Sequence, residues 1–191
     1  MAEARILVAE GNELAASALE DQLRSLGYGI VGIARNGGDV VRMCREHQPD
    51  LLIVDMQLPE LGSDWMRQVA ETSTPVVMIT SSSDTEGVRQ AEQAGALAYL
   101  VKPVNPEELP PAIDIALARH RELQQLREHV HGLQDTLDSH KVIERAKGIL
   151  MKRLNISDRE AEERIRQRGT EKQVPIKDIA QAIVDSDALL S

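Results

Sequence analysis

The sequence predicts an α/β domain built on a doubly wound, five-stranded parallel sheet, followed by a coiled-coil helix and an all-α three-helix bundle. Three observations support this prediction. Short apolar runs alternate with helix-length segments over residues 1–110. A stretch without proline then places apolar residues three and four positions apart. After His140 this repeat stops, and helical patterns separated by turn signals replace it.

The five apolar runs lack an alternation of polar and apolar residues, as expected for strands that are covered on both faces of a parallel sheet. They occupy residues 6–9, 30–33, 51–54, 76–79 and 97–101. We expect helices over about 12–26, 37–48, 63–72 and 84–94, with a glycine after the first and the last of them, Gly27 and Gly95. In a doubly wound sheet, ligands bind beyond the carboxyl ends of the strands.

Residues with reactive or charged side chains follow four of these strands. They are Glu10, Asp55, Thr80 with Ser81, and Lys102, which precedes Pro103. A carboxylate, a hydroxyl and an ammonium group in one crevice suit a phosphoryl group. The carboxylate can act as the nucleophile, while the hydroxyl and the ammonium group neutralise the transferred oxygens.

Residues 4–118 resemble the receiver domain of two-component response regulators, which has a flavodoxin-like fold. We assign 1–118 to this domain. The resemblance makes Asp55 the phosphorylated aspartate, in LLIVDMQLP at 51–59. It makes Thr80 the switch hydroxyl, Tyr99 the switch aromatic residue and Lys102 the phosphoryl contact, with a cis peptide bond before Pro103. It also implies a histidine kinase as partner and Mg²⁺ held by Glu10, Asp55 and the Gln57 carbonyl.

Two departures from the family pattern affect this site. The family has an acidic pair after the first strand, whereas this chain has Glu10 and Gly11, so that glycine replaces the direct Mg²⁺ ligand. The loop at 59–62 is also one residue shorter than usual. Mg²⁺ requires near-octahedral oxygen ligands, usually one or two carboxylates with waters. Two interpretations therefore stay open: a working phosphoryl acceptor, or a receiver fold retained as a scaffold.

Composition limits the class of protein and its compartment. No apolar run approaches the length of a membrane span, and the chain enters its first strand too early for a signal peptide. The single cysteine, Cys44, excludes a disulfide framework and suits a reducing cytosol, so we expect a cytoplasmic protein. Cys44 lies on the apolar face of the second helix and is expected in the core. Trp65 and Met66 are expected to pack the third helix, with an interface role for Trp65 as the alternative.

A long helix is predicted over about 107–154, and its middle part, 119–140, is interpreted as a coiled-coil linker. The apolar residues of this part repeat at spacings of 3, 4, 3 and 4: Leu123, Leu126, Val130, Leu133 and Leu137. A spacing that averages about 3.5 residues keeps one apolar stripe on one side of a helix and favours a partner helix. We expect a homodimer through this stripe. The alternative is an amphipathic helix folded back on its own domain.

Residues 141–191 are predicted to form a bundle whose first helix continues the long helix. Asn155 is a helix end that tolerates the left-handed conformation. Ser157 and Glu160 form a capping box for a second helix, which is expected to end near residue 168. A turn from 169 to 175 precedes a third helix over 176–190.

The segment KVIERAKGILM at 141–151, with Ser157 and Ala161 after it, resembles the ANTAR domain of antiterminator response regulators. That resemblance implies binding of nascent mRNA at paired short hairpins, which prevents transcription termination. Two residues differ from the usual ANTAR pattern. Glu162 stands where an aromatic residue is usual, and Gly169 where alanine is usual.

Charge supports a polyanion partner for the bundle. Residues 1–110 carry 17 acids and 8 bases, whereas residues 139–179 carry 11 bases and 7 acids. The residues expected to meet RNA are Lys141, Arg145, Lys147, Gly148, Lys152, Arg153, Arg166 and Arg168, with Lys172 adding to the basic surface. In the alternative, each base is a solvated partner of a nearby acid: Glu144, Glu160, Glu163 or Glu171.

The favoured function is a signal-responsive antitermination regulator that binds RNA. The runner-up is a degenerate receiver that dimerises and docks another protein without binding RNA. An enzyme is disfavoured because no catalytic constellation beyond self-phosphorylation is visible. DNA is an unlikely partner because the bundle lacks a helix-turn-helix pattern with a basic recognition helix.

Overall fold

The computed structural model describes residues 4–62, 64–81 and 95–188. They fall into two compact units, residues 1–124 and 125–191. The helix predicted over 84–94 lies outside the described residues.

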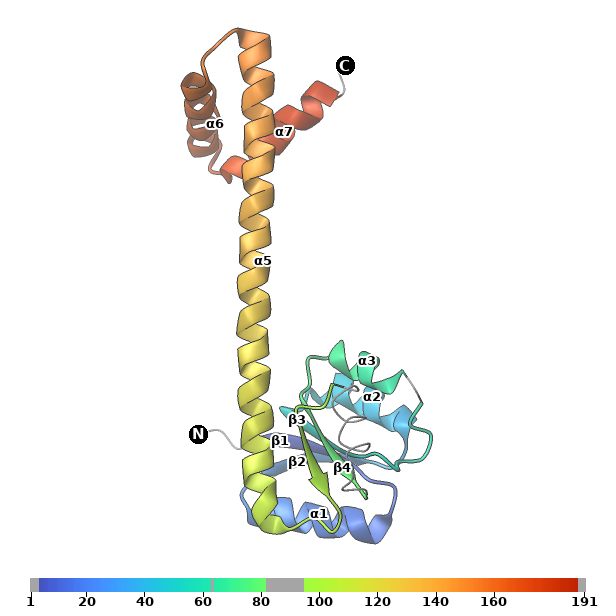
Figure 1. The fold of residues 1–191 in the computed structure, drawn as a ribbon. Helices are drawn as coiled ribbons and strands as arrows, with labels where there is room; N and C mark the ends of the chain where they lie inside the picture. The colour runs from blue at the N-terminus through green and yellow to red at the C-terminus, as the bar shows by residue number, and fades with distance from the viewer. Residues whose placement is uncertain (1–3, 63, 82–94, 189–191) are drawn as a thin grey trace. The chain divides into compact units, whose positions relative to one another are not determined.

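The first unit contains a five-stranded parallel sheet with the order β2-β1-β3-β4-β5 (Figure 1). The strands are β1 Arg5–Ala9, β2 Gly29–Ala34, β3 Leu51–Asp55, β4 Val76–Thr80 and β5 Ala98–Val101. The central strands β3 and β4 are buried at every position. The fold class predicted from the apolar runs is therefore confirmed, and Asp55 and Thr80 are each the last residue of a strand.

Helices cover both faces of this sheet. They are α1 Glu13–Ser25, α2 Gly37–His47, α3 Trp65–Ala70 and the first turns of α5 Leu109–Leu154, which follows a short 3₁₀ helix at Pro106–Glu108. Side chains of α1 and α5 pack in one core with alternate residues of β1, and side chains of α2 and α3 pack in a second core with the others. Cys44 is fully buried, and Trp65 and Met66 pack against the second core, as expected.

The second unit contains the C-terminal part of α5 with α6 Asp158–Lys172 and α7 Ile176–Ala188. Its core is formed by Ala146, Ile165, Ile179, Ala180 and Val184. Asn155 has a φ of 52°, and the capping box of Ser157 and Glu160 forms in full, so both end signals are confirmed.

The helix α6 is longer than predicted, because Gly169 lies inside it and not in the turn. Gly169 is buried, and a Cβ atom there would lie 3.2 Å from the carbonyl oxygen of Val174. The turn between α6 and α7 passes so close to Gly169 that a larger side chain would not fit easily, which explains why glycine occupies this position. The turn itself uses Gln173, whose φ is 55°.

No helix in the described part of the chain is long and apolar enough to cross a membrane.

Candidate functional sites

A crevice at the carboxyl ends of the strands brings together three of the predicted site residues. The Nζ atom of Lys102 lies 2.9 Å from Oε2 of Glu10 and 2.6 Å from Oδ2 of Asp55. The two carboxylates are almost fully buried, with 5% and 4% of their side-chain surfaces exposed. The crevice has a volume of about 420 Å³ and is also lined by Gln57 and Pro59.

The ammonium group of Lys102 is held in its charged form by the two carboxylates. Burial acts to lower the pKa of Lys102, but hydrogen bonds to Asp55 and Glu10 outweigh burial and raise this pKa. One positive charge is thus shared between two carboxylates, and an excess of negative charge is left in the crevice.

Backbone N–H groups hold the remaining carboxylate oxygens. Oε1 of Glu10 accepts from the N–H of Asn12 at 2.9 Å, and Oδ1 of Asp55 accepts from the N–H of Gln57 at 3.0 Å. Each of the four carboxylate oxygens therefore already accepts one hydrogen bond. This pattern fixes both carboxylates against rotation.

The residues present do not fit a preformed Mg²⁺ site. A Cβ atom at Gly11 would lie 2.7 Å from Cδ of Pro59, so the proline ring fills the space that a carboxylate at position 11 would need. Among the described residues, no group of three or more His, Cys, Asp or Glu side chains is placed to hold a metal ion. The resemblance to receiver domains implies Mg²⁺ at this place. Among the described residues that line the crevice, Glu10 and Asp55 supply the carboxylates, and both are engaged by Lys102.

The other residues assigned from the receiver resemblance lie near the crevice or at the surface. Thr80 is buried at the end of β4, and its carbonyl oxygen accepts from the N–H of Lys102 at 2.8 Å. The peptide bond between Lys102 and Pro103 is cis, as expected. Gln57 donates from its side chain to Oγ of Ser81 at 2.9 Å. Tyr99 lies on β5 with 42% of its surface exposed.

The thiol of Cys44 takes no part in either site. Burial raises its pKa to about 11, so it stays protonated and unreactive at neutral pH.

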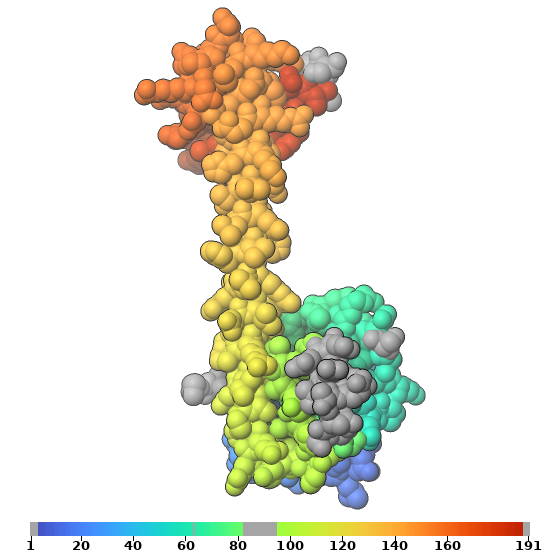
Figure 2. Space-filling view, viewed as in Figure 1, coloured from blue at the N-terminus to red at the C-terminus, as the bar shows by residue number. Residues whose placement is uncertain are grey.

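The apolar stripe of the predicted coiled coil is uncovered within this chain. Leu123, Leu126, Val130, Leu133 and Leu137 each leave between 42% and 59% of their surface exposed. Figure 2 shows side chains of this stretch of α5, in yellow, at the surface of the helix. Earlier positions of the same repeat belong to the receiver: Ala116 is buried, and Arg119 donates to the carbonyl oxygen of Leu97.

The residues predicted to meet RNA are distributed over three surfaces of the bundle. Lys141, Arg145, Gly148 and Lys152 are exposed and follow one another on the outer side of α5. Lys147 and Arg166 line a hollow of about 250 Å³ between α5 and α6. Arg153 and Arg168 line a larger groove together with Arg164, which the sequence analysis did not select.

Lys147 is a link between helices in this structure. Its side chain is 8% exposed, and Nζ lies 2.8 Å from Oδ1 of Asp158 and 2.9 Å from Oε1 of Glu144. Hydrogen bonds to Asp158 and then Glu144 raise the pKa of Lys147. Lys147 therefore joins α5 to the first turn of α6, and its ammonium group is already engaged.

Several of the other bases pair with acids on the same helix. Arg166 bonds Glu162 at 3.1 Å, Arg168 bonds Glu171 at 3.1 Å, and Lys141 lies 3.6 Å from Asp138. Such exposed pairs contribute little to stability, and a polyanion can displace them at small cost. A Cβ atom added at Gly148 would meet no described atom within 4 Å, so packing does not require glycine at this position.

Comparison with known families matches both parts of the chain. The response regulator receiver domain matches residues 6–114, and the ANTAR domain matches residues 131–184. The ANTAR match begins ten residues before residue 141, where the sequence predicts the start of the bundle. That boundary stays a prediction.

One relative matches almost the whole length of the chain. The chain is 35% identical over 184 residues to the transcriptional regulatory protein PdtaR of Mycobacterium tuberculosis, covering 95% of this chain and 90% of the relative. It is 33% identical over 117 residues to the probable C4-dicarboxylate response regulator DctR of Priestia megaterium, covering 59% and 50% of the two chains.

Solved structures agree for the first unit. The signal receiver domain of a modulated diguanylate cyclase from Desulfovibrio desulfuricans G20 has a TM-score of 0.55 and 32% identity, covering 62% of this chain and 97% of that one. A LuxR-family response regulator from Aurantimonas sp. SI85-9A1 has a TM-score of 0.56 and 27% identity, covering 61% and 86%. The chain thus belongs to the response regulators, with a receiver domain followed by an ANTAR domain.

Proposed function

We propose that this protein is a transcription antitermination regulator whose ANTAR bundle binds paired hairpins in nascent mRNA under the control of its receiver. The observation that carries this proposal is the union in one chain of a receiver and an ANTAR domain, with the excess of bases confined to the second. A polyanion is attracted to the basic part and repelled by the acidic part. The full-length similarity to a transcriptional regulatory protein supports the same assignment.

Dimerisation through the exposed stripe would place two bundles on one RNA. Leu123, Val130 and Leu137 fall at a positions and Leu126 and Leu133 at d positions; leucine at d and the β-branched Val130 at a match the pattern of two-stranded coiled coils. Flanking charges favour a second copy in parallel. Glu122 at a g position and Arg127 five residues later at an e position are both exposed, and a parallel partner brings each opposite its complement. Two hairpins on one transcript then match two bundles on one dimer.

Input is proposed to reach the receiver at Asp55 from a histidine kinase. The carboxylate of Asp55 lines the crevice with Lys102 beside it, which suits a phosphoryl acceptor whose charge an ammonium group neutralises. Mg²⁺ at this place is expected to bind weakly, because Pro59 closes off position 11.

The second candidate is a receiver that acts as a dimerisation and protein-docking module without phosphorylation. The contact between Gly11 and Pro59 is the observation that favours it, since a receiver with no third carboxylate has lost part of its metal site. A small phosphodonor distinguishes the two. If the phosphodonor adds one phosphoryl group to the wild type and none to Asp55→Asn, signalling through Asp55 is supported. If the wild type stays unmodified, the scaffold role is supported instead.

The RNA assignment is tested by binding of the full chain to an RNA with two hairpins and to a loop-scrambled control, each at several salt concentrations. We expect preference for the intact loops and an affinity that falls as salt rises, with a slope of about 0.7 to 1 per phosphate contact. If the full chain binds neither RNA at low salt, the antitermination assignment is wrong.

A further inference from the structure

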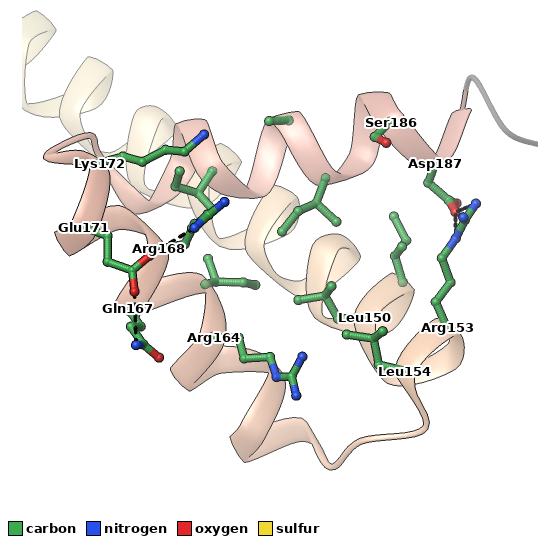
Figure 3. A pocket seen from close by; sticks show the side chains of 15 residues that line it. Leu150, Arg153, Leu154, Arg164, Gln167, Arg168, Glu171, Lys172, Ser186 and Asp187 are labelled. Atoms are coloured by element: carbon green, nitrogen blue, oxygen red, sulfur yellow. Dashed lines mark hydrogen bonds and ion pairs between the residues drawn. The ribbon is translucent and has the colours of Figure 1, made fainter.

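The ANTAR bundle carries an open groove of about 760 Å³ between α5, α6 and α7 (Figure 3). Apolar side chains of α5 and α7 line it, among them Leu150, Ile183 and Leu154, and Leu154 leaves 47% of its surface exposed. An apolar surface left open beside charged side chains on a small bundle is a feature of binding sites.

Four cations and two acids also line this groove. Arg153 and Asp187 are bonded at one end, from Nε to Oδ1 at 2.7 Å, and Arg168 and Glu171 form a pair at the other. The remaining cations are Arg164 and Lys172. Within the described residues neither forms an ion pair, although Arg164 attracts the carboxylate of Glu160 from a longer distance. Arg164, Arg168 and Lys172 are spaced four residues apart and so share one side of α6.

We propose that this groove holds one unstacked base of an RNA hairpin loop, with the guanidinium group of Arg164 stacked on the base. The proposal rests on the RNA-binding function proposed above. Residues 141–191 contain no Phe, Tyr, Trp or His, so within this segment a nucleobase has no aromatic side chain to stack on. Loop bases also stack on arginine planes, and Figure 3 shows Arg164 extending from α6 toward Leu150 and Leu154 of α5. A flat base fits between that plane and the leucines.

The acids in the groove select a base over a phosphate. The carboxylate of Asp187, whose charge Arg153 offsets, can accept a hydrogen bond from the amino group of a nucleobase, whereas a phosphate offers it no donor. Arg153 holds that carboxylate in place, and the hydroxyl of Ser186 lies beside it on the groove wall. Two cations of α6 face the phosphates on either side of the base: Lys172, and Arg168, whose exposed pair with Glu171 a phosphate can displace at small cost.

The other basic surfaces of the bundle suit a base less well. The hollow beside Arg166 is about 250 Å³, and its buried cation, Lys147, is already held by two carboxylates. The outer side of α5 with Arg145 and Lys152 does not line any of the hollows described for the bundle. The basic residues on these surfaces attract RNA of any sequence, whereas the groove recognises a nucleobase of the hairpin loop.

Arginine-to-lysine substitutions test this assignment in the full chain, because they keep the charge and remove the plane. We expect Arg164→Lys to weaken binding of the two-hairpin RNA by about tenfold, with no change for the loop-scrambled RNA or for the salt slope. Arg159→Lys is the matched control, since Arg159 lies on the same helix, is also exposed and does not line the groove. It should bind both RNAs within about twofold of wild type. Thermal unfolding confirms that both variants are folded.

A thiol footprint tests occupancy of the groove directly. Cys44 is buried with a raised pKa, so the new thiol of Ser186→Cys is the reactive one. The two-hairpin RNA should slow its alkylation several-fold, while the scrambled RNA should not. Gln181→Cys, an exposed position that does not line the groove, is the control and should react at one rate throughout.

Three outcomes overturn the proposal, and they are distinguishable. If wild type prefers the intact loops but Arg164→Lys shows the same preference, the base lies elsewhere. If the thiol of Ser186→Cys is not protected while RNA is bound, the groove stays empty in the complex. If wild type binds no RNA at all, the proposed function itself is wrong and the groove proposal is wrong with it.

Discussion

The backbone N–H of Gly37 donates to the carbonyl oxygen of Pro59 at 2.9 Å, and this bond anchors the short loop beside the acidic crevice. A Cβ atom at Gly37 would lie 2.2 Å from the carbonyl oxygen of Glu60, so the loop is in close contact with the start of α2. On its other side Pro59 covers Gly11. The position of this loop therefore excludes a side chain at position 11 and couples the missing acid to the path of the loop.

Gly11→Asp alone should not restore a metal site. The new side chain must displace Pro59 from an anchored loop, and such overpacking costs about 1–3 kcal/mol. We expect a lower unfolding midpoint and no gain in Mg²⁺ affinity, as measured by thermal unfolding and metal titration. Gly11→Asp combined with Pro59→Ala should bind Mg²⁺ more tightly than wild type.

Gly62→Asp is the control for that experiment, because it adds the same charge to the loop at a position where a Cβ atom meets nothing within 4 Å. It should change neither stability nor metal affinity appreciably. Tight Mg²⁺ binding by Gly11→Asp without the second change would contradict the coupling of the two positions.

The exposed stripe of α5 is expected to hold two chains together. Leu126→Asp with Leu133→Asp places charges in the seam and should leave a folded monomer, as judged by sedimentation and circular dichroism. Gln124→Asp with His131→Asp adds two acids at the same spacing outside the seam, and this control should stay dimeric. A seam variant that remains dimeric would move the interface to the receiver.

Lys147 is expected to support RNA binding by positioning α6. Lys147→Met should lower the unfolding midpoint of the bundle, because it leaves Asp158 and Glu144 without their shared cation. The folded-state pKa of Lys147 is raised above its ordinary 10.5, so this stabilisation is complete below about pH 10.5 and is lost as the pH rises further.

The RNA affinity of Lys147→Met should fall only with the fraction unfolded, measured on the same samples. Arg145→Gln is the comparison, because it removes an exposed basic residue for which no ion pair forms within the described part of the chain. If folded Lys147→Met lost more RNA affinity than Arg145→Gln, Lys147 would be a direct contact.

The capping box of α6 gives an acid-side test. A hydrogen bond from the backbone N–H of Ser157 lowers the pKa of Glu160, with a second from its hydroxyl group. This bonding stabilises the bundle above the ordinary pKa of 4.5 and is lost as the pH falls through the lowered value. Ser157→Ala should cost about 1 kcal/mol near neutral pH and flatten the acid limb of the unfolding curve. If Ser157→Ala loses stability at low pH as steeply as wild type does, the loss is due to other carboxylates.

Much of the fold could be predicted because its signals are local. Buried strands appear as apolar runs, and the residues after them must meet at one edge of the sheet, which brought Glu10, Asp55 and Lys102 together. The contact between Gly11 and Pro59 joins segments 48 residues apart through the path of a loop, and sequence spacing does not report such a path.

The bundle shows the same limit. A list of bases does not say which face each one occupies, because faces are set by how α6 and α7 cross α5. Lys147 was selected for its charge, and its burial between two acids depends on where α6 begins. Arg164 was missed, although its spacing from Arg168 and Lys172 is visible in the sequence.

The most direct test of the antitermination assignment is transcription in vitro across a terminator preceded by two hairpins. Full-length protein should raise readthrough on this template, and the gain should disappear when either hairpin loop is scrambled or when Leu126→Asp with Leu133→Asp replaces wild type. Readthrough that stays at its basal level with saturating wild-type protein, on a transcript that the protein demonstrably binds, would contradict the assignment.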